Sequence, residues 1–361
     1  MGRDYYLDRS KFHLATSASA YFSDLEENFK RAAQIQPVKD YWIEVAGIIF
    51  HLRFAGSALV PAVMPALAHL PTDVLPGPTI TFHLWDSAST GVVPPRPPFG
   101  ASDYDHYGKR AVNHHEFVSI MHAPAEQIVC AYDKQTRHAF FWTADAANMS
   151  IYERAAPLQT LFHWALAEFG WQIVHAAGLG TEAGGVLLIG SSGAGKSTTT
   201  LACLQSQILH FLSDDKCLVN LQPYPRALSL YNSAKIKSDM VEHLEKFNPY
   251  YEECDDTLKG RKCLLYLHPH FLTQMVAEFP IKAILIAKIT NTPSPLMTTI
   301  SPNQVLKILG PSTMIWLPGS EARSLHFIAS LAQRLPCYTL HLANTPSDNL
   351  DLIADTLQAH I

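Results

Sequence analysis

Charge is scarce in this chain, and no sign dominates. Of the 361 residues, 16% are Asp, Glu, Lys or Arg, and the formal net charge is −5 with the histidines taken as neutral. A nucleic-acid or anionic-membrane partner is recognised by an excess of Lys and Arg, so we expect neither. No apolar run reaches the length of a membrane-spanning helix. The opening residues also lack the apolar stretch of a secretory signal, and we expect a cytoplasmic protein.

Cysteine is also sparse. The six cysteines form no C-x-x-C pair, and several lie inside apolar stretches. We therefore expect buried, reduced thiols rather than a disulfide framework. Histidine pairs such as His114 with His115, or His268 with His270, lack the spacing and the partner cluster of a zinc site. No G-x-S-x-G elbow and no H-R-D or D-F-G motif occurs, which argues against an α/β-hydrolase and a eukaryotic-type protein kinase.

The apolar fraction of 48% is enough for a sizeable core, and 361 residues favour two domains. We predict a mixed α/β domain over residues 1–153 with antiparallel strand pairing, and we expect it to recognise a substrate or partner. A proline-rich loop at 91–100 and a candidate boundary at 152–157 mark its organisation. Its expected elements are a strand pair at 41–54 with a turn near Gly47, a helix at 59–70, and strands at 79–85, 117–120, 127–132 and 138–142.

Residues 154–361 show a different pattern, in which apolar runs alternate with helical segments. Near-continuous apolar runs are typical of strands that are covered on both faces. The expected elements are helices at 158–169, 198–206 and 348–357, and strands at 171–177, 186–189, 208–212, 263–267, 281–289 and 337–342. We therefore predict an α/β domain here.

Residues 190–197, GSSGAGKS, match the phosphate-loop (Walker A) pattern G-x-x-x-x-G-K-[ST] at every fixed position. An apolar strand precedes them and a helical segment follows, which is the context that the motif needs. The backbone N–H groups of such a loop converge on phosphate oxygens, the lysine pairs with the β- and γ-phosphates, and the Ser hydroxyl binds Mg²⁺. The expected nucleotide-binding residues are Gly190, Ser191, Ser192, Gly193, Ala194, Gly195, Lys196, Ser197 and Thr198.

Two adjacent carboxylates follow this loop. Asp214 and Asp215 come 18 and 19 residues after Lys196, directly after an apolar stretch. A helix of about 11 residues spans roughly 16 Å, and a returning strand of 5–6 residues spans about 17–20 Å. A parallel βαβ return therefore brings both aspartates level with the phosphates. One carboxylate can hold Mg²⁺ and the other can act as base towards a hydroxyl; the sequence leaves the two roles exchangeable.

Together these segments resemble the kinase domain of the HPr kinase/phosphorylase family. The similarity is closest to the HPr-kinase-like serine kinases, some of which occur in bacterial peptide-biosynthesis clusters. It covers roughly residues 156–361 and is carried by the stretch around His175, the phosphate loop and residues 211–215, FLSDD. The resemblance implies a fold like that of phosphoenolpyruvate carboxykinase, use of ATP and Mg²⁺, and phosphorylation of a serine hydroxyl on a peptide or small protein.

The resemblance also implies roles for single residues. His175 matches a histidine near the transferred phosphate, Lys196 and Ser197 match the loop's lysine and metal-binding hydroxyl, and Asp214 and Asp215 match the paired aspartates. Lys235 in one later segment, and Arg261 with Lys262 in another, are candidates for phosphate or substrate contacts or belong to exposed basic loops. The glycine/asparagine segment of the bifunctional enzymes is missing near the C-terminus, which argues against phosphorylase activity and against HPr as the acceptor.

We therefore predict an ATP- and Mg²⁺-dependent kinase for a serine or other hydroxyl of a peptide or protein. The expected catalytic residues are Asp215, Asp214, His175 and Lys196, and the expected metal ligands are Ser197 and Asp214. The alternatives are a nucleotide-binding regulator or ATPase, a small-molecule kinase or carboxykinase-like enzyme of the same fold, and a scaffold with a vestigial loop. The sequence leaves the acceptor and homo-oligomer formation open.

Overall fold

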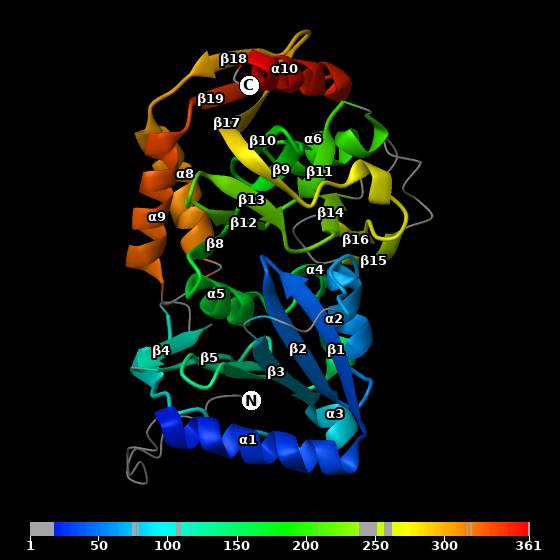
Figure 1. Cartoon of the computed structure of the whole chain (residues 1–361), viewed down its shortest axis with the longest axis vertical. Helices are drawn as coiled ribbons and strands as arrows, with labels where there is room; N and C mark the ends of the chain where they lie inside the picture. The colour runs from blue at the N-terminus through cyan, green and yellow to red at the C-terminus, as the bar shows by residue number, and fades with distance from the viewer. Residues whose placement is uncertain are drawn as a thin grey trace, which may run out of the picture. The chain divides into compact units, whose positions relative to one another are not determined.

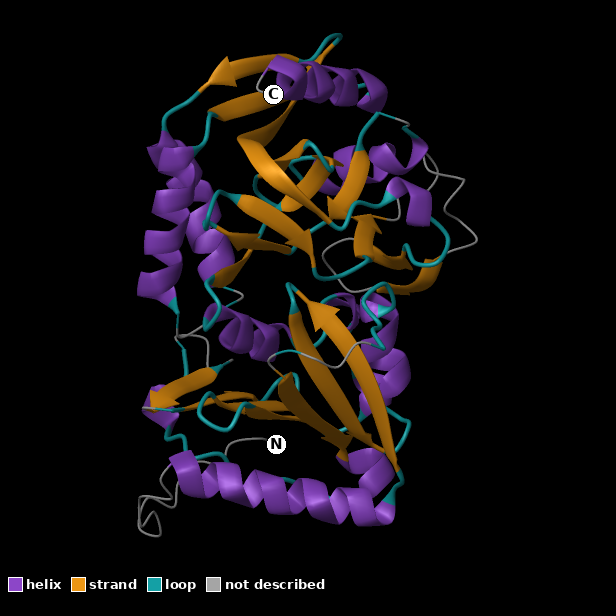
Figure 2. Cartoon of the chain, in the orientation of Figure 1, coloured by secondary structure: helices purple, strands orange, loops and turns teal. Residues whose placement is uncertain are grey.

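The computed structural model describes residues 18–73, 77, 79–105, 110–115, 117–206, 208–237, 251–255, 262–315, 317 and 320–359. The chain divides into two compact units (Figures 1 and 2). Unit 1 takes the residues up to Ala62, Thr72–Met149 and Thr160–Ala165, and unit 2 takes Val63–Pro71, Ser150–Gln159 and the residues from Leu166 onward. The chain thus passes between the units several times. Substrate recognition by residues 1–153 stays a prediction.

Unit 1 is built on a seven-stranded mixed sheet with the order β1-β2-β3-β7-β6-β5-β4. The predicted strand pair is confirmed as the antiparallel hairpin β1–β2, with its turn at Ala46 and Gly47. The prediction of antiparallel pairing is wrong at the centre of the sheet, where β3 runs parallel to both β2 and β7. The strands are β1 (Val38–Val45), β2 (Ile48–Ala55), β3 (Thr79–Asp86), β4 (Ala111–His115), β5 (Val118–Ala123), β6 (Ile128–Asp133) and β7 (His138–Thr143).

Helix α1 (Ala18–Ile35) covers one face of this sheet. Tyr21, Leu25, Phe29 and Ala32 recur at helical spacing and are buried against Trp85 and neighbouring strand residues. On the opposite face, Phe50, Phe82 and Phe162 pack with ring centroids 5.1–5.3 Å apart. The short helical elements of unit 1 are α3 (Ser87–Thr90), η1 (Ala101–Asp103) and η2 (Ala146–Asn148), whereas α2 (Val60–Leu67) begins in unit 1 and ends in unit 2.

Unit 2 is built on a nine-stranded sheet around the long strand β17. The first residues of β17 pair antiparallel with β13, and its later residues pair parallel with β10 and β19. The sheet consists of β8 (Trp171–Val174), β9 (Ala177–Thr181), β10 (Gly184–Ile189), β11 (His210–Ser213), β12 (Cys217–Asn220), β13 (Arg226–Ser229), β17 (Glu278–Thr292), β18 (Leu296–Thr299) and β19 (Cys337–Ala343).

Helices cover both faces of this sheet, which explains its near-continuous apolar strands. In β10, Val186 and Leu188 pack in the core shared with α6 and α10, whereas Leu187 and Ile189 pack in the core shared with α8 and α9. Figure 1 shows α8 and α9 lying beside each other. The helical elements of unit 2 are α4 (Ile151–Ala155), α6 (Lys196–Ala202), η3 (Cys203–Gln205), η5 (Leu272–Gln274), α8 (Pro302–Met314), α9 (Glu321–Arg334) and α10 (Pro346–Ala359), and most of α5 (Gln159–Ala167) belongs to unit 1.

A small three-stranded sheet packs against α6. Its order is β14-β16-β15, with β14 (Ser233–Lys237), β15 (Tyr251–Asp255) and β16 (Lys262–Tyr266). Ala234, Ile236 and Leu265 share a core with Leu201 of α6 and with Phe211. This core fixes β14 next to the end of β11, where the two aspartates lie.

Three sequence predictions for unit 2 need correction. Residues 171–177 form two strands rather than one, because the chain breaks at His175 between β8 and β9. Strand β11 is parallel to β10, as predicted, but β9 lies between them and pairs antiparallel with each. The helix predicted at 198–206 begins at Lys196 and ends at Ala202, followed by η3.

The cysteines follow the prediction in part. Cys130, Cys203, Cys217 and Cys337 are buried and free, as expected. Cys263 is disulfide-bonded, so the prediction of reduced thiols is wrong there. Burial raises the pKa of the Cys337 thiol, which keeps that group protonated.

None of the helices in the described residues is long and apolar enough to span a membrane.

Candidate functional site

The loop between β10 and α6 depends on three glycines. Gly190, Gly193 and Gly195 have φ values of 154°, 82° and 95°, a region that L-residues with a side chain rarely adopt. A Cβ at Gly195 would also lie 2.5 Å from Cδ1 of Leu342, and one at Gly190 would lie 3.2 Å from the carbonyl oxygen of Ala287. The loop therefore lies close against β17 and β19, and the glycine positions of the motif match the backbone that it needs.

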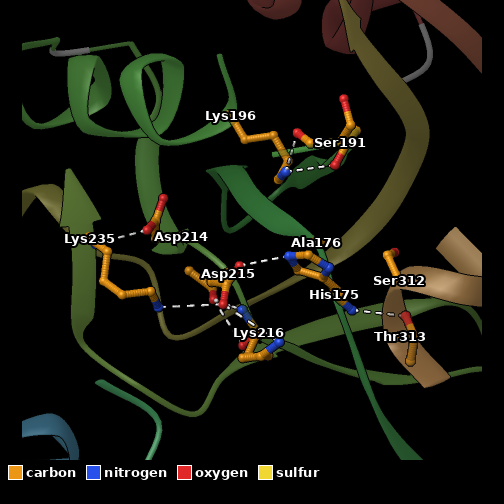
Figure 3. Close-up of polar contacts among 12 residues, drawn as sticks. His175, Ala176, Ser191, Lys196, Asp214, Asp215, Lys216, Lys235, Ser312 and Thr313 are labelled. Atoms are coloured by element: carbon orange, nitrogen blue, oxygen red, sulfur yellow. Dashed lines mark hydrogen bonds and ion pairs between the residues drawn. The ribbon is translucent and has the colours of Figure 1, made fainter. Parts of the chain in front are cut away.

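The side chain of Lys196 returns over this loop. Its ammonium donates to the carbonyl oxygens of Gly190 at 2.7 Å and Ser191 at 3.2 Å (Figure 3). Burial lowers the pKa of Lys196, and the nearby carboxylates of Asp215 and Asp214 oppose that change. The ammonium is thus held among the loop's backbone groups, where the motif places a nucleotide's phosphates.

Asp214 lies at the end of β11 and faces α6. It is almost fully buried, with 2% of its surface exposed. Its Oδ2 accepts from the backbone N–H of Lys235 at 3.0 Å, and its Oδ1 accepts from Oγ1 of Thr200 at 3.4 Å. Burial raises the pKa of Asp214, while Lys235 and a hydrogen bond from the Ser197 hydroxyl oppose that rise. Asp214 and Ser197, the predicted metal ligands, are therefore neighbours.

The side chain of Asp215 points away from that of Asp214. It contacts the side chains of His175, Lys216 and Lys235. Its Oδ1 lies 2.8 Å from Nε2 of His175, and its Oδ2 lies 3.4 Å from Nζ of Lys235 and 3.5 Å from Nζ of Lys216 (Figure 3). Burial by itself would raise the pKa of Asp215, but the two ammonium groups and His175 outweigh it and hold the pKa well below its usual range. The carboxylate is therefore ionised, and 27% of its side-chain surface is exposed.

His175 reaches Asp215 because the chain changes course there. It lies between β8, which pairs with β12, and β9, which pairs with β10 and β11. Its backbone N–H donates to Oγ1 of Thr313 on α8 at 3.1 Å, which ties the break to the helix behind it. From the sequence we expected His175 near the end of a strand. Neither the break in the strand nor the contact with Thr313 could be predicted from it.

The structure places two of the three candidate basic residues, and they differ in their contacts with the aspartates. Lys235 lies on β14 and contacts both aspartates, Asp214 through its backbone and Asp215 through its ammonium. Lys262 lies on β16, 5.8 Å from the ring centroid of Tyr152, and interacts with the aspartates only electrostatically. Arg261 lies outside the described residues.

Lys216 is a site residue that the sequence reading missed. Only 6% of its side-chain surface is exposed. Burial lowers its pKa to about 8, against the opposing effect of Asp215. One sequence feature could have pointed to Lys216: it directly follows Asp214 and Asp215, so its ammonium can reach a carboxylate.

The site fits a magnesium ion that is shared with phosphates. Mg²⁺ is usually held by one or two carboxylates or hydroxyls of the protein together with phosphate oxygens and water. Ser197 and Asp214 offer such a pair of oxygen ligands. Within the part of the chain that the structure describes, no group of three His, Cys, Asp or Glu side chains could hold a metal by itself.

Comparison with known proteins gives only distant structural similarity. No protein-family model and no curated protein matches the chain. Among solved structures, it is similar to the Hpr(Ser) kinase/phosphatase from Coxiella burnetii, at 13% sequence identity and a TM-score of 0.30, over 52% of this chain and 90% of that chain. At this identity and score, the likeness assigns no family. The chain is a mixed α/β protein.

Proposed function

We propose that this protein is an ATP- and Mg²⁺-dependent phosphotransferase that moves the γ-phosphoryl group to a hydroxyl, most simply a serine of a peptide or protein. The observation that carries the proposal is the division between adjacent carboxylates. Asp214 lies with the loop hydroxyl of Ser197, whereas Asp215 turns away to His175 and two lysines. A site that only bound a nucleotide would need the Asp214 carboxylate beside Ser197. It would not need the Asp215 carboxylate.

The loop residues would bind the nucleotide. The backbone N–H groups of residues 190–197 hold the β- and γ-phosphates, and the ammonium of Lys196 exchanges its carbonyl partners for phosphate oxygens. Ser197 and Asp214 would hold Mg²⁺, which would supply positive charge to neutralise that of the phosphates. Lys235 lies beside both aspartates and supplies a further positive charge near the transferred group.

Asp215 would orient the acceptor. The acceptor oxygen attacks the γ-phosphorus as the bond to the β-phosphate's bridging oxygen breaks, ADP leaves, and the hydroxyl proton passes to Asp215. A carboxylate with a lowered pKa is a weak base. That suits a loose transition state in which the hydroxyl loses its proton late and positioning matters more than basicity. His175 fixes the carboxylate through its Oδ1.

The test is phosphoryl transfer itself. The full chain is incubated with Mg²⁺ and ATP together with peptides and proteins of the native host, and the products are analysed by mass spectrometry. We expect a phosphate on a hydroxyl with the wild type, loss of that product with Asp215→Asn, and no change with Asp351→Asn, an exposed aspartate on α10. Binding of ATP with release of phosphate to water only would favour the ATPase alternative. A phosphorylated metabolite would favour the small-molecule kinase.

A further inference from the structure

Lys216 occupies a position that a lysine rarely takes. It lies between β11 and β12, and only 6% of its side-chain surface is exposed. Ammonium groups are almost never buried unless a charged partner compensates for the loss of water. Solvent is the default environment of a lysine in a loop, so its inward direction needs a cause. The ion pair with Oδ2 of Asp215, at 3.5 Å, supplies one.

The backbone of the turn directs Lys216 inward. The hydroxyl of the buried Ser213 donates to the carbonyl oxygen of Lys216 at 2.8 Å and accepts from its N–H at 3.3 Å. This double contact closes residues 213–216 into a tight turn. Asp214 and Asp215 project from the turn towards different partners, and the Lys216 side chain lies beside the carboxylate of the residue before it.

The two lysines at Asp215 differ in what else they hold. Lys235 is engaged with both aspartates, because its backbone N–H binds Asp214 and its ammonium lies near Asp215. Lys216 approaches the same Oδ2 from the turn itself. His175 contacts the other oxygen, Oδ1. Contacts from three separate segments thus reach one carboxylate, and they restrict its rotation about the Cβ–Cγ bond.

We infer that Lys216 is a positioning residue of the transfer: its buried ammonium fixes Oδ2 of Asp215, so that the carboxylate keeps its contact with His175 and presents its remaining lone pairs to the acceptor hydroxyl. This inference rests on the proposed function of the site. The competing explanation is that Lys216 only stabilises the turn. The two explanations differ because a positioning residue acts through Asp215, whereas a purely structural lysine acts whether or not Asp215 is ionised.

A double-mutant cycle separates them. Lys216→Met keeps the length of the side chain without its charge, and Lys216→Arg keeps the charge. We expect Lys216→Met to lower kcat at least about tenfold with KM for Mg–ATP changed less than about twofold, because orientation of the reacting groups affects the rate of the step. Lys216→Arg should recover part of the loss. In the Asp215→Asn background, Lys216→Met should change the residual rate less than about twofold. An equal loss in both backgrounds, or an unchanged kcat, would overturn the inference.

A structural readout keeps the inference testable if no acceptor is phosphorylated. Crystal structures of the full-length wild type and of Lys216→Met, both checked for folding by thermal denaturation, show the orientation of Asp215 directly. We expect the variant to lose the 2.8 Å contact between Asp215 and His175, or to show Asp215 in more than one orientation. An unchanged contact contradicts the positioning role. Absence of transfer by the wild type counts against the proposed function alone. If Lys216→Met does not fold, Lys216→Gln takes its place.

Discussion

At the scale of single residues, the two aspartates divide the chemistry. Asp214 is buried beside Thr200 and Ser197, and Asp215 lies with His175, Lys216 and Lys235. Adjacent residues at the end of a strand point in different directions, so one short turn provides two environments. Burial raises the pKa of Asp214, whereas the lysines hold that of Asp215 low. The two aspartates therefore differ in their expected roles because their neighbouring residues differ.

This division predicts different defects for matched variants. With Asp214→Asn, we expect the Mg²⁺ concentration for half-maximal rate to rise at least about tenfold, because a charged ligand oxygen is lost. With Asp215→Asn, we expect kcat to fall about 100-fold or more with no such shift, because the residue acts on the hydroxyl. Initial rates over a magnesium titration give both values. A magnesium shift in Asp215→Asn and none in Asp214→Asn would mean that the roles are exchanged.

A buried histidine in unit 1 predicts sensitivity to acid. Burial, together with the smaller effects of His138, Arg53 and His51, lowers the pKa of His83 to about 3. An unfolded histidine titrates near 6.5, so between about pH 6.5 and 3 the unfolded chain binds more protons than the folded one. The free energy of unfolding therefore falls as the pH falls through this window.

The comparison with His83→Gln isolates this effect. Between pH 6.5 and 4.5, we expect the wild type to lose about 1–2 kcal/mol more unfolding free energy than the variant. Denaturant titrations at the two pH values measure it. The same loss in both proteins would show that His83 does not carry the acid sensitivity.

At the scale of elements, the phosphate loop is held by its packing against β17 and β19. Gly193 and Gly195 both have positive φ, but a Cβ at Gly193 meets nothing within 4 Å, whereas one at Gly195 meets Leu342 at 2.5 Å. A side chain at either position would strain the backbone. Only at Gly195 would its Cβ also clash with a neighbouring side chain.

This pair gives a prediction with its own control. Each change to Ala costs about 1–2 kcal/mol of backbone strain, and Gly195→Ala adds about 1–3 kcal/mol because Leu342 is buried and must move. We expect Gly195→Ala to have the lower melting temperature and the weaker ATP binding. Thermal denaturation and calorimetric titration with ATP test this order, and equal stability of the two variants would contradict the packing argument.

The elements also show what the sequence could and could not predict. Residues 190–197 combine fixed letters with a required strand and helix, so loop and context were both predictable. The break at His175 was not, because residues 171–177 are mostly apolar and nothing local marks the point where pairing changes from β12 to β10 and β11. The clustering of Lys216 and Thr313 with the aspartates and His175 depends on tertiary packing, which no short motif encodes.

At the scale of the whole molecule, the candidate site belongs to unit 2. The loop, both aspartates, His175 and the lysines all lie in its segments. Helix α1 belongs to unit 1, and the sequence prediction contained no helix there although Tyr21, Leu25, Phe29 and Ala32 recur at helical spacing. The parallel pairs of β3 were missed because alternation along a strand does not reveal the direction of its neighbours.

Because the candidate site belongs to unit 2, we predict that a variant which destabilises unit 1 still binds ATP normally. Leu25 on the inner face of α1 is fully buried, so Leu25→Ala should cost about 2–5 kcal/mol of unfolding free energy. Lys30→Ala, on the exposed face of the same helix, should cost less than about 0.5 kcal/mol. Under conditions in which both variants remain folded, ATP affinity should match the wild type. A weaker affinity in Leu25→Ala alone would show that unit 1 contributes to the nucleotide site.

The most direct test of the account is a crystal structure of the full chain with Mg²⁺ and a non-hydrolysable ATP analogue. We predict the triphosphate in the loop of residues 190–197, the Lys196 ammonium on phosphate oxygens, Mg²⁺ at Ser197 and Asp214, and the γ-phosphate facing Asp215. A nucleotide bound elsewhere, or a γ-phosphate directed away from Asp215, would contradict the assignment of this site to phosphoryl transfer.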